Sequence, residues 1–236
     1  MATAIITGGA LRLGRQMALY LAQKGFNIAL HYHRSSKEAE GVIKEIRSCK
    51  VRCKGFSLDL TELQSVESFI SQVVQHFEDI SLLVNSAAIF PTGKIEETET
   101  EKLLSVLKLN LIAPFILMRE YRKKVNKGQI VNILDQRIAK NLPLHSAYSI
   151  SKVALAHLTS LGAVEFGNKI RVNGMALGLI LPVTEADKAF FEQKKEKIPL
   201  KKSGNVEAVL KGLGYLIAND FVTGEILYID GGESKS

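Results

Sequence analysis

The sequence predicts a single α/β domain in which helices flank a seven-stranded, doubly wound parallel sheet. Apolar runs of strand length alternate with amphipathic stretches of helix length along most of the chain, which is typical of parallel strands joined by crossover helices. The length of 236 residues suits one such domain. No linker or repeat marks off a second domain, so residues 1–236 are assigned to one unit.

The expected elements can be placed in order along the chain. Strands are expected at 3–7, 27–32, 51–57, 81–85, 128–134, 169–174 and 225–229, and helices at 12–24, 36–48, 62–77, 100–124, 146–166 and 205–217. Right-handed crossovers would gather the strands into one sheet whose ligands bind beyond the carboxyl ends of the strands. The segment 178–202 breaks the alternation with Pro182, Pro199, a helical piece near 185–195 and a cluster of lysines. It is expected to form a substrate lid.

The composition argues against several other classes of protein. No apolar run approaches the roughly 20 residues of a membrane span, and the first strand-like run leaves no room for a secretory signal, so a cytoplasmic protein is expected. Cys49 and Cys53 lack the partners of a zinc site, so no metal is expected. The net charge of +7 is scattered and accompanies no nucleic-acid-binding motif, so no nucleic acid partner is expected.

A glycine-rich turn joins the first expected strand to the first expected helix. It reads Thr7-Gly8-Gly9-Ala10-Leu11-Arg12-Leu13-Gly14. Glycine lets the backbone turn tightly and approach a pyrophosphate, and the free N–H groups at the helix start favour its negative charge. This Rossmann-type turn predicts a dinucleotide site that includes Gly8, Arg12, Leu13 and Gly14.

The end of the second expected strand indicates which dinucleotide binds. A NAD enzyme of this fold usually carries an acid here for the ribose 2′-hydroxyl, but no Asp or Glu lies between Phe26 and Lys37. His33, Arg34 and Ser35 offer donors to a 2′-phosphate instead, and the arginine can bind it through two donors at once. NADPH is therefore the expected cofactor. Further cofactor contacts are expected from Asp59, Leu60, Asn85, Ser86 and Ala87.

A tyrosine and a lysine form the expected chemical centre. Tyr148 and Lys152 fall within the expected helix 146–166, where four-residue spacing places them one turn apart on the same face. An adjacent cation favours the phenolate over the phenol. It would bring a group with a reference pKa near 10 toward proton transfer at neutral pH.

In this order along the chain, the motifs resemble the short-chain dehydrogenase/reductase family. They are the glycine turn, Asn85-Ser86-Ala87, Asn110, Tyr148, Lys152 and Asp230-Gly231-Gly232, and the resemblance extends from Thr3 to Gly232. It implies that Tyr148 donates the proton and that Lys152 lowers the pKa of Tyr148 and holds the nicotinamide ribose. It further implies that Asn110 supports a proton-relay water and that Gly178 contacts the cofactor.

Three departures make the chain similar to the pteridine reductases, including the bacterial dihydromonapterin and dihydrofolate reductases. Asp135 stands where ordinary members carry a serine donor; an ionised carboxylate only accepts hydrogen bonds and would repel a developing alkoxide. Arg12 replaces a further glycine of the turn, and Phe90 offers a flat face opposite the nicotinamide. The resemblance implies that Arg12, Phe90, Asp135 and Tyr148 bind a pterin or folate.

Two alternatives remain open. A carbonyl reductase, such as a 3-oxoacyl carrier-protein reductase, is disfavoured by Asp135, and a non-catalytic NADPH-sensing protein is disfavoured by the intact Tyr148, Lys152 and Asn110. The subgroup pattern is also incomplete, because Ser86, Ala88 and Leu177 replace residues common there. The family resemblance implies a homo-oligomer, with a tetramer favoured, assembled through the helices expected at 100–124 and 146–166.

Overall fold

Seven parallel strands form one sheet in the computed structural model, which describes residues 1–181 and 187–236. The strands are β1 (Thr3–Ile6), β2 (Asn27–Tyr32), β3 (Cys53–Ser57), β4 (Ile80–Asn85), β5 (Gly128–Asp135), β6 (Ile170–Leu177) and β7 (Ile226–Ile229). Their order is β3-β2-β1-β4-β5-β6-β7, and every neighbouring pair is parallel. The predicted doubly wound α/β fold is thus confirmed.

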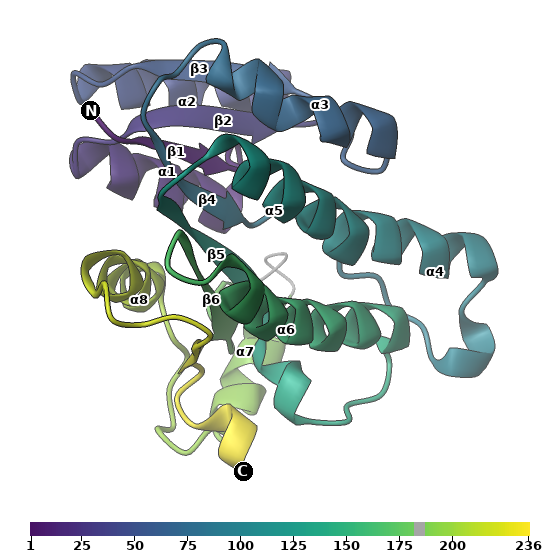
Figure 1. The fold of residues 1–236 in the computed structure, drawn as a ribbon. Helices are drawn as coiled ribbons and strands as arrows, with labels where there is room; N and C mark the ends of the chain where they lie inside the picture. Colours follow the sequence, from purple (N-terminus) through teal and green to yellow (C-terminus); the bar gives the residue numbers. More distant parts are fainter. Residues whose placement is uncertain (182–186) are drawn as a thin grey trace.

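Helices cover both faces of this sheet (Figure 1). One face carries α1 (Arg12–Gln23), α2 (Ser36–Ser48) and α8 (Val206–Ala218), and the other carries α3 (Leu63–Val74), α4 (Thr100–Leu107), α5 (Ala113–Lys124) and α6 (Ser146–Phe166). Met17 and Leu213 are fully buried in the first apolar layer, and Phe69 and Tyr121 in the second. Burying each such side chain contributes about 1.5–3 kcal/mol, so both layers hold the sheet in place.

The expected long helix at 100–124 is interrupted in its middle. Between α4 and α5 lies a π-helical turn, Lys108–Ile112, which contains Asn110. Pro114 accounts for the break, because it has no N–H to donate to the carbonyl of Asn110 four residues earlier and its ring crowds that carbonyl. The wider turn relieves this conflict, and such turns are frequent at functional sites.

Strand β6 is longer than predicted, which brings the sheet closer to the site. It continues to Leu177, where it pairs with Asp135 at the end of β5. Gly178 follows at once and begins the segment expected to form a lid. Within that segment α7 spans Asp187–Lys195, close to the helical piece expected near 185–195, whereas Pro182 lies outside the described residues.

Other boundaries shift by a few residues. The helix expected at 62–77 ends at Val74, and the strand expected at 51–57 begins at Cys53.

The order of strands reverses between β1 and β4, and this reversal defines the crevice where doubly wound folds bind ligands. Among the helices that the structure describes, none is long and apolar enough to cross a membrane.

Candidate active site

The glycine turn has the conformation that a phosphate cradle requires. Gly8 has a φ of 65°, in the left-handed region that glycine adopts without strain. A Cβ atom on Gly14 would lie 2.1 Å from the carbonyl oxygen of Gly8, so no other residue fits there. Arg12, the first residue of α1, also has a positive φ of 48°. The backbone is thereby folded tightly at the start of α1, where the dipole and free N–H groups favour an anion.

His31 holds this turn, a role that the sequence analysis missed. The Gly8 N–H donates to its Nδ1 at 3.1 Å, and its Nε2 lies 3.0 Å from the Leu58 carbonyl oxygen, to which it donates. The ring is only 2% exposed, and burial lowers the pKa of His31 to about 4. It is therefore neutral and fixed in one tautomer by its two partners. A histidine inside an apolar strand gave no signal by which this role could be read from the sequence.

A groove of about 700 Å³ runs from the glycine turn past the ends of β2 and β3. Most of the expected cofactor residues line it, namely Gly8, Arg12, Leu13, Gly14, His33, Arg34, Ser35, Asp59, Leu60, Ser86 and Ala87. Asn85 is an exception: its side chain is buried and donates to Oδ1 of Asn132 at 2.8 Å inside the sheet. Since the glycine cradle and the basic end of β2 open into one groove, these residues fit a dinucleotide that carries an additional phosphate.

An acidic side chain does reach the basic end of this groove, but from the loop that follows β3. Oδ2 of Asp59 lies 3.5 Å from Nε2 of His33. The pKa of Asp59 is lowered first by the backbone N–H of Thr61, which donates to its Oδ1 at 2.8 Å, and further by the Thr61 hydroxyl and by His33 and Arg34. Asp59 is thus an ionised hydrogen-bond acceptor on the wall of the groove. It lies beside His33 and Arg34, two donors suited to phosphate.

A second cavity of about 710 Å³ adjoins this groove and contains the expected chemical centre. Arg12, Leu13, Ser86, Ala88 and Ile133 line both spaces, so the two are continuous. The expected residues Phe90, Asp135, Tyr148, Lys152 and Gly178 line the second cavity. A substrate in it would lie next to a dinucleotide in the groove.

Asp135 and Tyr148 are hydrogen-bonded to each other. The Tyr148 hydroxyl donates to Oδ2 of Asp135 at 3.0 Å, and Oδ1 accepts the backbone N–H of Arg137 at 2.9 Å. Burial raises the pKa of Tyr148 well above its usual value near 10, and the Asp135 carboxylate raises it further. Tyr148 is therefore a protonated phenol whose proton points to a carboxylate.

The expectation that Lys152 lowers the pKa of Tyr148 is wrong for this geometry. Nζ of Lys152 donates to the carbonyl of Ile133 at 2.6 Å and lies 5.8 Å from the centre of the Tyr148 ring. Burial lowers the pKa of Lys152 itself to about 8. The four-residue spacing does place both groups on one helix face, but Asp135 is the nearer charge and has the opposite effect.

Asn110 acts on the loop that carries Phe90. Its side-chain oxygen accepts the Ile89 N–H at 3.0 Å, and its amide donates to the Ile89 carbonyl at 3.0 Å and to the Ser151 hydroxyl at 3.2 Å. The residue is fully buried in the π turn. These bonds tie the residue before Phe90 to α6, so Asn110 positions the aromatic wall; support of a relay water stays a prediction.

Phe90 has aromatic and cationic neighbours that the sequence did not reveal. The His145 ring is stacked on it with centroids 3.8 Å apart and an angle of 11°, and the Tyr148 ring meets it edge-on at 4.5 Å. The Arg137 guanidinium lies 5.4 Å from the ring centre. Burial lowers the pKa of His145, with Arg137 adding to the effect. His145 and Arg137 both line the cavity.

The expected lid contributes to one wall of the cavity. Phe191 and Lys194 of α7 line it together with Glu233, and Nζ of Lys194 lies 3.0 Å from Oε1 of Glu233. Other lysines of the segment have partners outside the cavity: Lys195 pairs with Glu192, and Lys201 donates to the Glu196 carbonyl. The segment therefore offers fewer cations to a substrate than its sequence suggests.

The chain belongs to the short-chain dehydrogenase family, whose model matches residues 2–195. Among solved structures it is similar to the FolM alternative dihydrofolate reductase 1 of Brucella suis in complex with NADP, with a TM-score of 0.94 and 30% identity over 100% of this chain and 96% of that one. The enzyme of the same name from Brucella canis, complexed with NADP, gives a TM-score of 0.93 at 30% identity, over 100% and 95% of the two chains.

Curated relatives include an enzyme of a different activity. The 3-oxoacyl-[acyl-carrier-protein] reductase FabG of Staphylococcus epidermidis is 27% identical over 98% of both chains. An uncharacterised oxidoreductase of Thermotoga maritima is 28% identical over 98% of this chain and 96% of its own length. The comparisons therefore establish an oxidoreductase family and leave two substrate classes to be separated by the site.

Proposed function

We propose that the chain is an NADPH-dependent pteridine reductase that converts a dihydropterin, dihydromonapterin or dihydrofolate to its tetrahydro form. The observation that carries this proposal is the hydrogen bond between Tyr148 and Asp135 at the base of a cavity continuous with the dinucleotide groove. A phenol and a carboxylate side by side offer one donor and several acceptors to the polar edge of a pterin. The similarity to dihydrofolate reductases crystallised with NADP supports the same substrate class.

NADPH is held by two parts of the groove. The N–H groups at the start of α1, around Gly8 and Gly14, would receive its pyrophosphate, while His33, Arg34 and Ser35 would bind the 2′-phosphate. Lys152 and Gly178 line the neighbouring cavity, where the nicotinamide end would meet the substrate. When bound, NADPH supplies a hydride to a C=N carbon of the pteridine ring.

The residues of the chain orient the ring and deliver the proton. Phe90 gives the cavity a flat aromatic wall, Asn110 holds the backbone before it, and Arg12 contributes a cation between groove and cavity. The raised pKa keeps Tyr148 protonated, so it can donate to the ring nitrogen beside the carbon that is reduced. The Asp135 carboxylate accepts N–H donors at the pterin edge and aligns the phenol.

A 3-oxoacyl carrier-protein reductase is the second candidate, favoured by the similarity to FabG. Its substrate carbonyl needs hydrogen-bond donors where the alkoxide develops. Here that position holds Asp135, which is already accepting two hydrogen bonds and repels negative charge. This geometry supports the pteridine assignment over the carbonyl one.

Parallel assays of NADPH oxidation test the proposal. The purified protein is given dihydrobiopterin, dihydromonapterin, dihydrofolate or acetoacetyl carrier protein, with and without NADH in place of NADPH. The proposal expects the highest kcat/KM with one of the three pteridines and NADPH. Efficient turnover of the acetoacetyl thioester alone would support the second candidate, and NADPH binding with no turnover of any substrate would support a sensing role.

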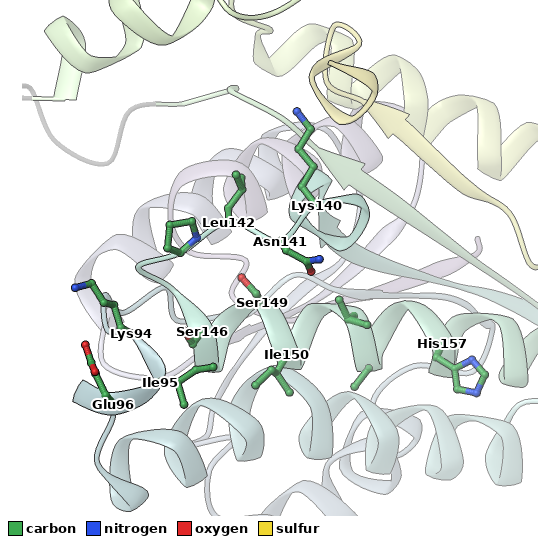
Figure 2. A pocket seen from close by; sticks show the side chains of 13 residues that line it. Lys94, Ile95, Glu96, Lys140, Asn141, Leu142, Ser146, Ser149, Ile150 and His157 are labelled. Atoms are coloured by element: carbon green, nitrogen blue, oxygen red, sulfur yellow. The ribbon is translucent and has the colours of Figure 1, made fainter.

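We further propose that the protein assembles as a homo-oligomer through α4, α5 and α6. Several large apolar side chains of these helices are exposed, among them Leu104, Phe115, Ile150, Val153 and Val164, the last at 82%. The same face is hollowed by a cavity of about 970 Å³ beside Ile150 and His157 of α6 (Figure 2). An exposed apolar patch of this kind is typical of an interface between subunits.

The mass in solution tests this assembly. The protein should elute as a dimer or tetramer, and Val164→Glu should shift it toward the monomer by placing a charge in the interface. Lys44→Glu, which alters an exposed position of α2 on the opposite face of the sheet, should leave the mass unchanged. A monomeric wild-type protein would contradict the proposal.

A further inference from the structure

Arg137 holds an unusual position at the wall of the substrate cavity. It lies in the short 3-10 turn Gln136–Ala139, two residues after Asp135, to which its backbone N–H donates. Its guanidinium lines the cavity and lies 5.4 Å from the centre of the Phe90 ring. Planar guanidinium groups lie favourably over aromatic faces, so the contact holds the cation in a defined place.

The N–H donors of the Arg137 guanidinium meet no acceptor among the side chains that the structure describes. Within residues 1–181 and 191–236, neither a hydrogen-bond acceptor nor an ion-pair partner reaches the Arg137 side chain, and its Nη1 atom is fully buried. A guanidinium carries five N–H donors and no acceptor, and a buried donor left unmet carries a desolvation penalty. The arrangement is that of a cation prepared for an anionic ligand.

Neighbouring charges of the cavity already have protein partners. Lys194 pairs with Glu233 at 3.0 Å, and Lys152 donates to the Ile133 carbonyl. Asp135 accepts from Tyr148 and from the backbone of Arg137, so its carboxylate does not neutralise the guanidinium through a direct bond. An incoming carboxylate would therefore meet its best partner at Arg137, because an arginine binds both carboxylate oxygens at once.

We propose that Arg137 binds a carboxylate on the side chain of the substrate and thereby makes the enzyme prefer a folate to a pterin with an uncharged side chain. This inference rests on the proposed function and adds the substrate class to it. The Phe90 ring beneath Arg137 is 43% exposed, which marks the open side of the cavity, whereas the buried Lys152 marks its floor. A ring held at the floor would direct its side chain toward Arg137.

The test compares Arg137→Gln, which removes the charge, with Arg137→Lys, which retains it. Lys202→Gln removes a charge from an exposed position that does not line the cavity and serves as the matched control. KM and kcat are measured with NADPH for dihydrofolate and for dihydrobiopterin, whose side chain is uncharged. Arg137→Gln should raise KM for dihydrofolate about tenfold or more, with kcat and both dihydrobiopterin constants within about twofold of wild type.

Arg137→Lys should recover part of the loss, and Lys202→Gln should have no effect. An unchanged KM for dihydrofolate in Arg137→Gln, or an equal rise for both substrates, would overturn the inference while leaving pteridine reduction intact.

If the wild type reduced neither substrate, the proposed function would fail. Equilibrium binding of folate to the NADP-loaded protein would then decide the inference about Arg137 by itself. Equal folate affinity in wild type and Arg137→Gln would then overturn it. Thermal unfolding identifies a misfolded variant, in which case Arg137→Lys gives the deciding comparison.

Discussion

The hydroxyl of Tyr148 donates its hydrogen bond to Asp135 at 3.0 Å, which makes the central tyrosine a protonated phenol held by a carboxylate. Burial and this carboxylate both favour the neutral phenol. A reaction that consumes a proton from the enzyme is served by such a group, since the proton is present throughout the neutral pH range. Asp135 also fixes the direction in which the phenol points.

Tyr148→Phe removes this proton while preserving the ring that meets Phe90 edge-on. We expect kcat with the pteridine substrate to fall by about 10²- to 10⁴-fold, the usual contribution of a positioned general acid. NADPH affinity, measured by fluorescence titration, should change little. Tyr20→Phe alters a tyrosine that lines neither cavity and provides the control. Undiminished turnover in Tyr148→Phe would show that the proton comes from another source.

Arg34→Ala tests the proposed 2′-phosphate contact. The loss of one charge-assisted contact is worth about 1.5–3 kcal/mol, so KM for NADPH should rise about tenfold or more while KM for NADH changes little. Lys37→Ala removes an exposed charge nearby on α2 and should affect neither cofactor. Steady-state kinetics with both cofactors give the comparison, and equal effects of Arg34→Ala on the two would refute the assignment.

His31 should make the fold less stable in acid. Its pKa is lowered by burial to about 4 in the folded protein, against about 6.5 when unfolded. The unfolded state therefore takes up a proton that the folded state does not as the pH falls from about 6.5 to 4, and stability decreases over that interval by about 3 kcal/mol. Above pH 6.5 the His31 imidazole is neutral in both the folded and the unfolded state, so its contribution to the pH dependence vanishes.

Urea unfolding between pH 7 and pH 4 checks this prediction in wild type and in His31→Asn. Carboxylates such as Asp59 also titrate in this range, but they are common to both proteins, so the difference between the two curves isolates the histidine. The wild type should lose about 3 kcal/mol more than the variant. Parallel curves would contradict the assigned tautomer and its bond to Gly8.

Periodicity was enough to predict the sheet, because a strand buried on both faces has to be apolar along its length. It could not place the break at Asn110, since α4 and α5 are both amphipathic and the interruption depends on one proline acting four residues back. The extension of β6 to Leu177 likewise depends on its pairing with β5, a contact remote in the sequence.

The candidate site was predictable where a local spacing brings residues together, as it places Tyr148 and Lys152 one helix turn apart on the wall of one cavity. It was not predictable where the partner comes from another element. Asp135 reverses the expected effect on the Tyr148 pKa because β5 ends beside α6, and His145 reaches Phe90 from the turn before α6. The roles of Arg137 and His31 were not predictable for the same reason, since each depends on contacts with residues of other elements that no sequence spacing indicates.

The substitution Asp135→Ser tests the account most directly, because Asp135 distinguishes pteridine chemistry from carbonyl chemistry. Serine restores a neutral donor but removes the carboxylate that holds Tyr148. Rates of NADPH oxidation are compared for dihydropterin and acetoacetyl carrier protein, with Asp79→Ser, an exposed position, as the control. We expect kcat/KM for dihydropterin to fall by about 10- to 1000-fold with NADPH affinity nearly unchanged. Unchanged dihydropterin turnover in the variant, together with efficient reduction of the acetoacetyl thioester by the wild type, would contradict the pteridine assignment.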